Sequence, residues 1–239
     1  MTTKINFPAL MLVAITLFSL TSCDVFGVRS NGELETEIRN VDNFHALEIN
    51  VPGDIEVRTG DEYKVEVTCE NSVIAYLETI EDEGVLKIHF DRDVFDVDNL
   101  KIRVWAPSWD SFVINGSADV DVPDAIQGEL LKLGVSGSGN IKVFNADFTD
   151  IDTRVSGSGD VNLSGNADHL KCTVSGSGDV DALSCPVKTA IVTVSGSGNV
   201  RLNVSDSLNV TISGSGDVEY EGDPQVTKQV SGSGNVRKI

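Results

Sequence analysis

The second half of the chain, from residue 115 onward, alternates between apolar and polar residues on both sides of one recurring polar motif. The motif reads Ser-Gly-Ser-Gly-Asp/Asn-Val/Ile, and its copies begin at Ser136, Ser156, Ser175, Ser195, Ser213 and Ser231, with spacings of 20, 19, 20, 18 and 18 residues. Counted from the first serine, positions −5, −3, −1, +5 and +7 are mostly Val, Leu or Ile. This alternation predicts strands with one buried face, and β-branched side chains suit such a pleated wall.

A self-similarity with a period of roughly 20 residues is the signature of a solenoid. A degenerate copy of the motif begins at Asn115 and a fainter one at Asn50, so the repeat extends towards the N-terminus. If successive copies stack at the usual strand spacing of about 4.8 Å, valine lies on valine and serine on serine. We therefore predict an all-β protein whose residues 115–239 form a parallel β-helix, right-handed, with 18–21 residues in each rung.

The same alternation assigns a direction to each side chain of the motif. The serines and the Asp/Asn residue point outward, whereas both glycines fall on the inward parity. An inward glycine predicts that another wall or a sharp bend comes close, and glycine also tolerates the positive φ of a corner.

Residues 44–114 also alternate, but they lack the serine–glycine motif. Short strand patterns are separated there by turn residues, as in Thr59-Gly60-Asp61 and Asp82-Glu83-Gly84. We expect either longer, irregular rungs or a small antiparallel cap. A cap has a physical reason, because an open solenoid end exposes strand edges that invite pairing with other chains.

The N-terminus carries the features of an export signal. Lys4 precedes an apolar stretch from Ile5 to Leu20, which is shorter than the roughly 20 apolar residues of a membrane span. The stretch ends in Leu20-Thr21-Ser22-Cys23, which resembles a bacterial lipobox. Residues 1–22 are therefore predicted to be a lipoprotein signal peptide, and Cys23 is predicted to carry the lipid.

The residues that follow Cys23 are polar and lack a clear period, so residues 23–43 are predicted to form a tether. Several acyl chains on one cysteine anchor a protein far better than a single chain does. We expect a cell-envelope protein that is lipid-anchored to the outer membrane, on its surface or on its periplasmic face.

Together, the lipobox, the segment Phe44-His45-Ala46-Leu47-Glu48-Ile49, the element Val-Pro-Gly-Asp-Ile at 51–55 and the repeated motif resemble a known family. The chain resembles the putative auto-transporter adhesin, head GIN domain family over residues 44–239. The resemblance implies a β-helical envelope protein with an adhesin role. It supplies no catalytic residues to transfer to this sequence.

The net charge of −19 disfavours nucleic acid as a partner, because the protein's field repels phosphates. The predicted function is a non-enzymatic, adhesin-like interaction module that presents rows of Ser, Asp and Asn to a protein or glycan. The alternative is a structural or regulatory envelope protein that faces the periplasm. An enzyme is not predicted, because the motif faces offer only Ser, Asp and Asn with no His or Arg beside them, and a serine nucleophile needs a nearby base.

Calcium is the one cofactor with a candidate site in the sequence, although the prediction is that the protein binds none. The outward acids of successive rungs include Asp160, Asp179 and Asp217, and Ca²⁺ prefers carboxylate oxygens. Asn replaces Asp freely at this position, which weakens such a site, and Asp and Asn are also ordinary turn residues.

Two tryptophans and two cysteines complete the candidates. Trp105 and Trp109 flank Pro107 and could form a platform for a sugar ring, or could instead pack against the cap. Counted from the first serine of the motif, Cys172 falls at position −3 among core residues, whereas Cys185 falls at position +10. Because the two positions do not stack on each other, a disulfide between them is not expected.

Overall fold

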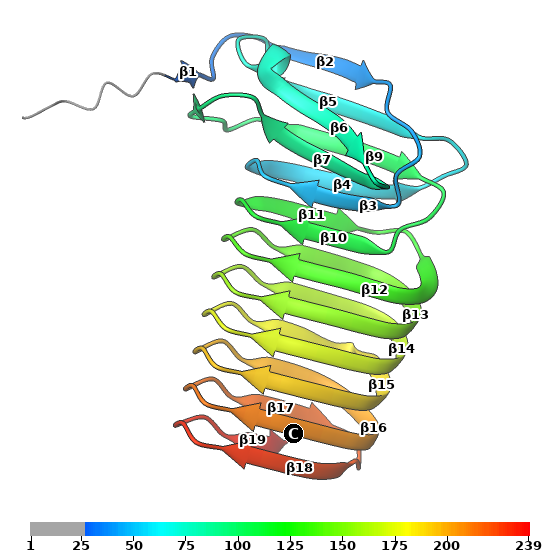
Figure 1. The fold of residues 1–239 in the computed structure, drawn as a ribbon, viewed down its shortest axis with the longest axis vertical. Coiled ribbons are helices and arrows are strands. Elements are labelled where there is room, and N and C mark those ends of the chain that lie inside the picture. Colours follow the sequence, from blue (N-terminus) through cyan, green and yellow to red (C-terminus); the bar gives the residue numbers. More distant parts are fainter. Residues whose placement is uncertain (1–26) are drawn as a thin grey trace, which may run out of the picture.

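The computed structural model describes residues 27–239, so the predicted signal peptide and Cys23 lie outside the described residues. Figure 1 shows a tall stack of strands with the cap at one end and the C-terminal strands at the other. Each rung runs along one face, passes through a Ser-Gly-Ser-Gly turn at one edge and returns along the opposite face (Figure 1). The predicted all-β solenoid is confirmed.

The coil is built from parallel strands that pair in register. Its strands are β10 (Ser111–Ile114), β11 (Ala118–Val122), β12 (Ile126–Val135), β13 (Ile141–Val155), β14 (Val161–Val174), β15 (Val180–Val194), β16 (Val200–Ile212), β17 (Val218–Glu221), β18 (Gln225–Val230) and β19 (Val236–Lys238). Val135 pairs with Val155, and the same column continues through Val174, Val194 and Ile212. All five side chains are buried, so position −1 forms one continuous column of the core.

The N-terminal region combines the two alternatives that its sequence left open. β3 (Ala46–Ile49) and β4 (Gly53–Thr59) pair in parallel with β10 and β11, and β7 (Val85–Phe90) and β9 (Lys101–Ala106) add a further parallel layer. Antiparallel strands then close the end, because β6 (Leu77–Asp82) pairs with β7 and β5 (Lys64–Glu70) pairs with β9. A short 3-10 helix, η1 (Ile74–Tyr76), connects β5 to β6.

The prediction that residues 23–43 form a tether is wrong where the structure has two strands in this segment. β1 (Val28–Arg29) pairs with β8 (Val94–Phe95), and β2 (Leu34–Arg39) pairs with β5 along its whole length. Glu35, Glu37 and Arg39 lie opposite buried residues of β5, so they occupy the core side of the last strand. That side is open to water at the end of a solenoid. Because it carries charged residues, β2 lacks the alternation of apolar and polar residues that predicts a strand with one buried face.

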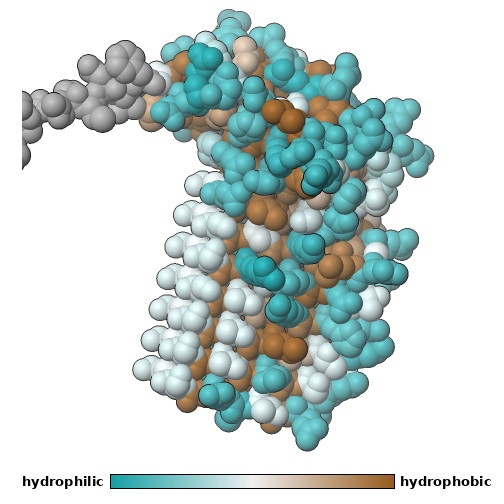
Figure 2. Space-filling model, viewed as in Figure 1, coloured by the Kyte–Doolittle hydropathy of each residue, from teal (hydrophilic) through white to brown (hydrophobic). Residues whose placement is uncertain are grey.

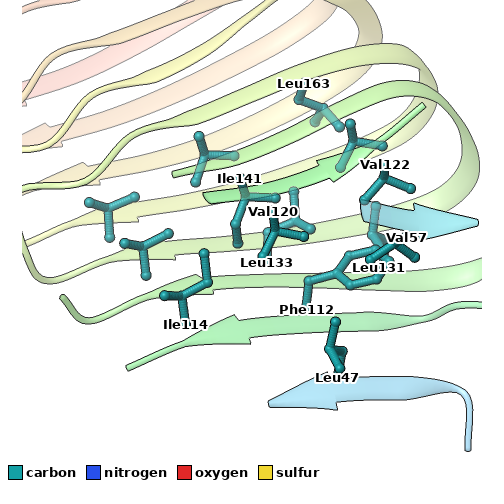
Figure 3. Packing of buried hydrophobic residues seen from close by; sticks show 14 of the residues in the cluster. Leu47, Val57, Phe112, Ile114, Val120, Val122, Leu131, Leu133, Ile141 and Leu163 are labelled. Carbon is teal, nitrogen blue, oxygen red and sulfur yellow. The ribbon is translucent and has the colours of Figure 1, made fainter. Parts of the chain in front are cut away.

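The core runs without interruption from the cap into the coil. Leu47, Phe112 and Leu133 occupy paired positions on three neighbouring strands and lie one above the other in Figure 3. Each of them is at most 1% exposed. Residues far apart in sequence therefore share one hydrophobic stack, which makes the cap and the coil a single folding unit.

The motif glycines lie in a bend, as predicted, and the chain that comes close to them is the backbone of the preceding rung. A Cβ atom on Gly176 would lie 1.9 Å from the backbone oxygen of Gly157 in the preceding rung, and Gly178 meets Gly159 in the same way. Among residues 27–239, no glycine of the six complete motifs has a positive φ. The glycines thus allow backbone to stack on backbone at the bend, and the predicted positive φ of a corner does not explain them.

The cysteines of the described region are free and buried. Burial raises the pKa of the Cys172 thiol to about 12 and that of Cys185 to about 11. Cys172 and Cys185 are not bonded to each other in this structure, and both lie in the core as small residues that hold their protons.

Candidate functional site

The Asp/Asn residues of the motif form a hydrogen-bonded ladder that connects successive rungs. The backbone N–H of Asp179 donates to Oδ1 of Asp160 at 2.8 Å, and the N–H of Asn199 donates to Oδ1 of Asp179 at 2.6 Å. The pattern extends from Asp119 to Asn235, and each side-chain oxygen accepts from the rung that follows. A short side chain with an acceptor oxygen is what this position requires, so either Asp or Asn satisfies it.

This ladder changes the interpretation of the calcium candidates. Asp160 and Asp179 are neighbours in it, whereas Asn199 separates Asp179 from Asp217. In each of the three acids, Oδ1 already accepts a backbone N–H. Within residues 27–239, no three His, Cys, Asp or Glu side chains gather as metal ligands would.

We expect removal of divalent ions to leave the melting temperature unchanged to within about 2 °C, which corresponds to less than 1 kcal/mol. The physical reason is that the ladder is held by hydrogen bonds to the backbone and needs no cation. The measurement is thermal unfolding of the purified protein with excess EDTA and with millimolar Ca²⁺. A rise of several degrees with Ca²⁺ alone would show that the acids bind the ion.

A second row of polar side chains runs beside the ladder, at position +6 of each rung. Arg201 lies 3.0 Å from Asp181 and 3.5 Å from Glu219, and Arg237 pairs with Glu219 as well. All four side chains are at least partly exposed, so each ion pair contributes little to stability. Their main consequence is for the chemical character of the surface, because hydrogen-bond donors and acceptors alternate along the row.

Two grooves lie between these rows on the same face of the coil. One has a volume of about 390 Å³ and extends from Asp160 to Arg237. The other has a volume of about 660 Å³, lies where the coil meets the cap, and is lined by residues that include Asp119, Lys142 and Phe144. Sequence reasoning missed Phe144, although an aromatic residue at an outward position was a usable signal.

The tryptophans do not form the predicted platform. Trp109 is 1% exposed and packs against Phe44 and Phe112, with ring centroids 5.8 and 5.6 Å away. Its indole N–H donates to the backbone oxygen of Arg58 at 3.0 Å. Trp105 is partly exposed, but the ammonium of Lys64 lies 4.6 Å from the centre of its ring. Of the two hypotheses from the sequence, packing against the cap is therefore the correct one for Trp109.

The serines of the motif form an exposed ridge along one edge of the molecule, in agreement with their predicted outward direction. Figure 2 shows this ridge as a pale, uncharged strip along the stacked turns. Teal, hydrophilic side chains gather over the cap and along the opposite edge, and the face between the two edges mixes teal, white and brown (Figure 2).

By its fold and its surface, the protein is a β-solenoid with repeated polar rows and a closed N-terminal end. The chain belongs to the family described as putative auto-transporter adhesin, head GIN domain, whose model matches residues 43–224. The comparison with curated proteins gives no match. Among residues 27–239, no helix has the length and apolar character needed to cross a membrane.

Solved structures share the fold at low sequence identity. A putative adhesin from Bacteroides fragilis has a TM-score of 0.83 at 20% identity, covering 89% of this chain and 100% of that chain. A putative adhesin from Parabacteroides merdae has a TM-score of 0.70 at 21% identity, covering 89% and 99%. A chain from Parabacteroides distasonis, described as a putative lipid binding protein, has a TM-score of 0.75 at 20% identity, covering 89% and 99%.

Proposed function

We propose that the protein is a lipid-anchored, non-enzymatic interaction module of the cell envelope, with an adhesin-like role at the outer membrane. The observation that carries this proposal is the repetition of the same exposed polar rows on a rigid stack of strands. Such rows can bind a protein or glycan at many points at once, and many weak contacts add up to useful affinity. The family description and the names of the structural relatives support an adhesion role.

The short distance between Cys23 and the first described residue gives the anchor a geometric consequence. Only four peptide links separate Cys23 from Gly27, so this segment spans at most about 14 Å when fully extended. β1 and β2 then hold the chain against the cap. A lipid on Cys23 would therefore keep the cap close to the bilayer, with the serine ridge and the coil extending from it.

Replacing Cys23 with alanine is expected to abolish incorporation of fatty acid into the protein, because this thiol is the proposed site of the lipid. Labelling of the producing cells with radioactive palmitate, followed by immunoprecipitation, measures this. Cys172→Ala is the matched control and should remain labelled, since that thiol lies in the core. Labelling of the Cys23 variant at the level of the parent protein would contradict the proposed anchor.

The periplasm-facing structural or regulatory role is the second candidate, because it requires the same anchor and the same rigid stack. It differs from adhesion only in the side of the outer membrane on which the coil lies. Accessibility of the coil from outside the cell separates the two roles.

A further inference from the structure

The face that carries the two grooves offers hydrogen-bonding groups at a fixed interval. The Asp/Asn ladder contributes seven residues from Asp119 to Asn235, one in each rung. At about 4.8 Å for each step between rungs, this row is roughly 29 Å long. The charged row with Arg201 and Glu219 runs parallel to it, so rungs that present two carboxylates alternate with rungs that present an Asn and an Arg.

Phe144 marks the end of this face that lies nearest the cap. Its side chain is 55% exposed, whereas Phe95 and Tyr63 are 37% exposed. It lines the larger groove together with Pro123, Lys142 and Asp121. An exposed aromatic ring next to charged hydrogen-bonding groups combines an apolar stacking surface with polar anchors.

The chemistry of the face selects among polymers. A polyanion is disfavoured, because carboxylates outnumber the basic groups along both grooves. An extended peptide finds no backbone partners, because these strands are already paired on both sides, and its repeat of about 6.6 Å for two residues does not match the rungs. Hydroxyl groups both donate and accept, so they suit a face where carboxylates and guanidinium groups alternate.

We propose that this face binds an extended, uncharged polysaccharide, with one sugar ring stacked on Phe144 and the following sugars lying along the groove. A sugar unit in an extended chain is about as long as the step between two rungs, so each unit lies beside one rung and every second unit meets the same kind of side chains. This inference rests on the proposed interaction function and names its ligand class and its site. The proposed stacking surface for a sugar is therefore Phe144 on the coil, in place of Trp105 and Trp109.

Binding of hexasaccharides to the purified full-length protein tests the proposal. The probes are β-1,4-linked hexamers of mannose, glucose and xylose, with a galacturonic acid hexamer as the charged comparison, measured by isothermal titration calorimetry. At least one neutral hexamer should bind, and its affinity should rise from the disaccharide to the hexasaccharide. Phe144→Ala should weaken that binding by about tenfold or more, because the stacking surface is lost.

Ile191→Ala is the matched control, since Ile191 is also 55% exposed but lies outside both grooves. It should leave the affinity unchanged, and both variants should melt like the parent protein. The inference is overturned if no neutral hexamer binds, if the charged hexamer binds more tightly, or if the two variants weaken binding equally. Such a result would leave the envelope anchor and the exposure of the coil, which other measurements test, unaffected.

Discussion

Replacing Gly176 with valine should destabilise the protein by about 3 kcal/mol or more, at the upper end of the range for overpacked sites. A Cβ atom at this position would lie 1.9 Å from the backbone oxygen of Gly157, and backbone atoms of the preceding rung cannot move aside as a side chain can. The rungs would have to separate locally, which breaks hydrogen bonds such as the one from Ser177 N–H to the Gly157 oxygen. The midpoint of urea unfolding measures this loss.

Ser177→Ala is the control from the same turn. Its side chain is exposed, so the substitution should change the free energy of unfolding by no more than about 0.5 kcal/mol. A similar loss of stability in both variants would mean that the close stacking of motif glycines does not hold the rungs together.

Replacing Trp109 with alanine should cost about 3–5 kcal/mol, as for other large aromatic residues removed from a core. The ring lies between Phe44 and Phe112, where the cap meets the coil, and its N–H bond to the Arg58 oxygen would also be lost. Thermal and urea unfolding should both show a large shift.

Trp105→Ala provides the comparison, because this residue is partly exposed. Its interaction with Lys64 is of a kind that contributes about 0.5–1 kcal/mol at exposed sites, so its loss should be much smaller. Equal losses in the two variants would contradict the assignment of Trp109 to the shared core.

The repeat made most of the coil predictable. Because identical residues stack on one another, a single alignment of the motif copies assigned Val135 and its successors to the core and the serines to the surface. The Asp/Asn residues were also placed outward correctly. Their hydrogen bonds to the next rung were not predictable, since these depend on the register between rungs and not on alternation along one strand.

The ends of the solenoid were harder to predict because the core side of a terminal strand is open to water. β2 therefore carries Glu35, Glu37 and Arg39 where an internal strand would carry valine, and it reads as a polar tether. Trp109 presented the opposite difficulty. Its position near Pro107 left both an exposed platform and packing against the cap open, and contacts with residues distant in sequence bury it.

The most direct test of the adhesin-like role is protease treatment of intact cells that make this protein, with a soluble periplasmic protein as the internal control. The proposed function predicts that the protein is digested while the periplasmic control stays intact. Protection of the protein until the outer membrane is permeabilised would contradict adhesion and favour the periplasm-facing role.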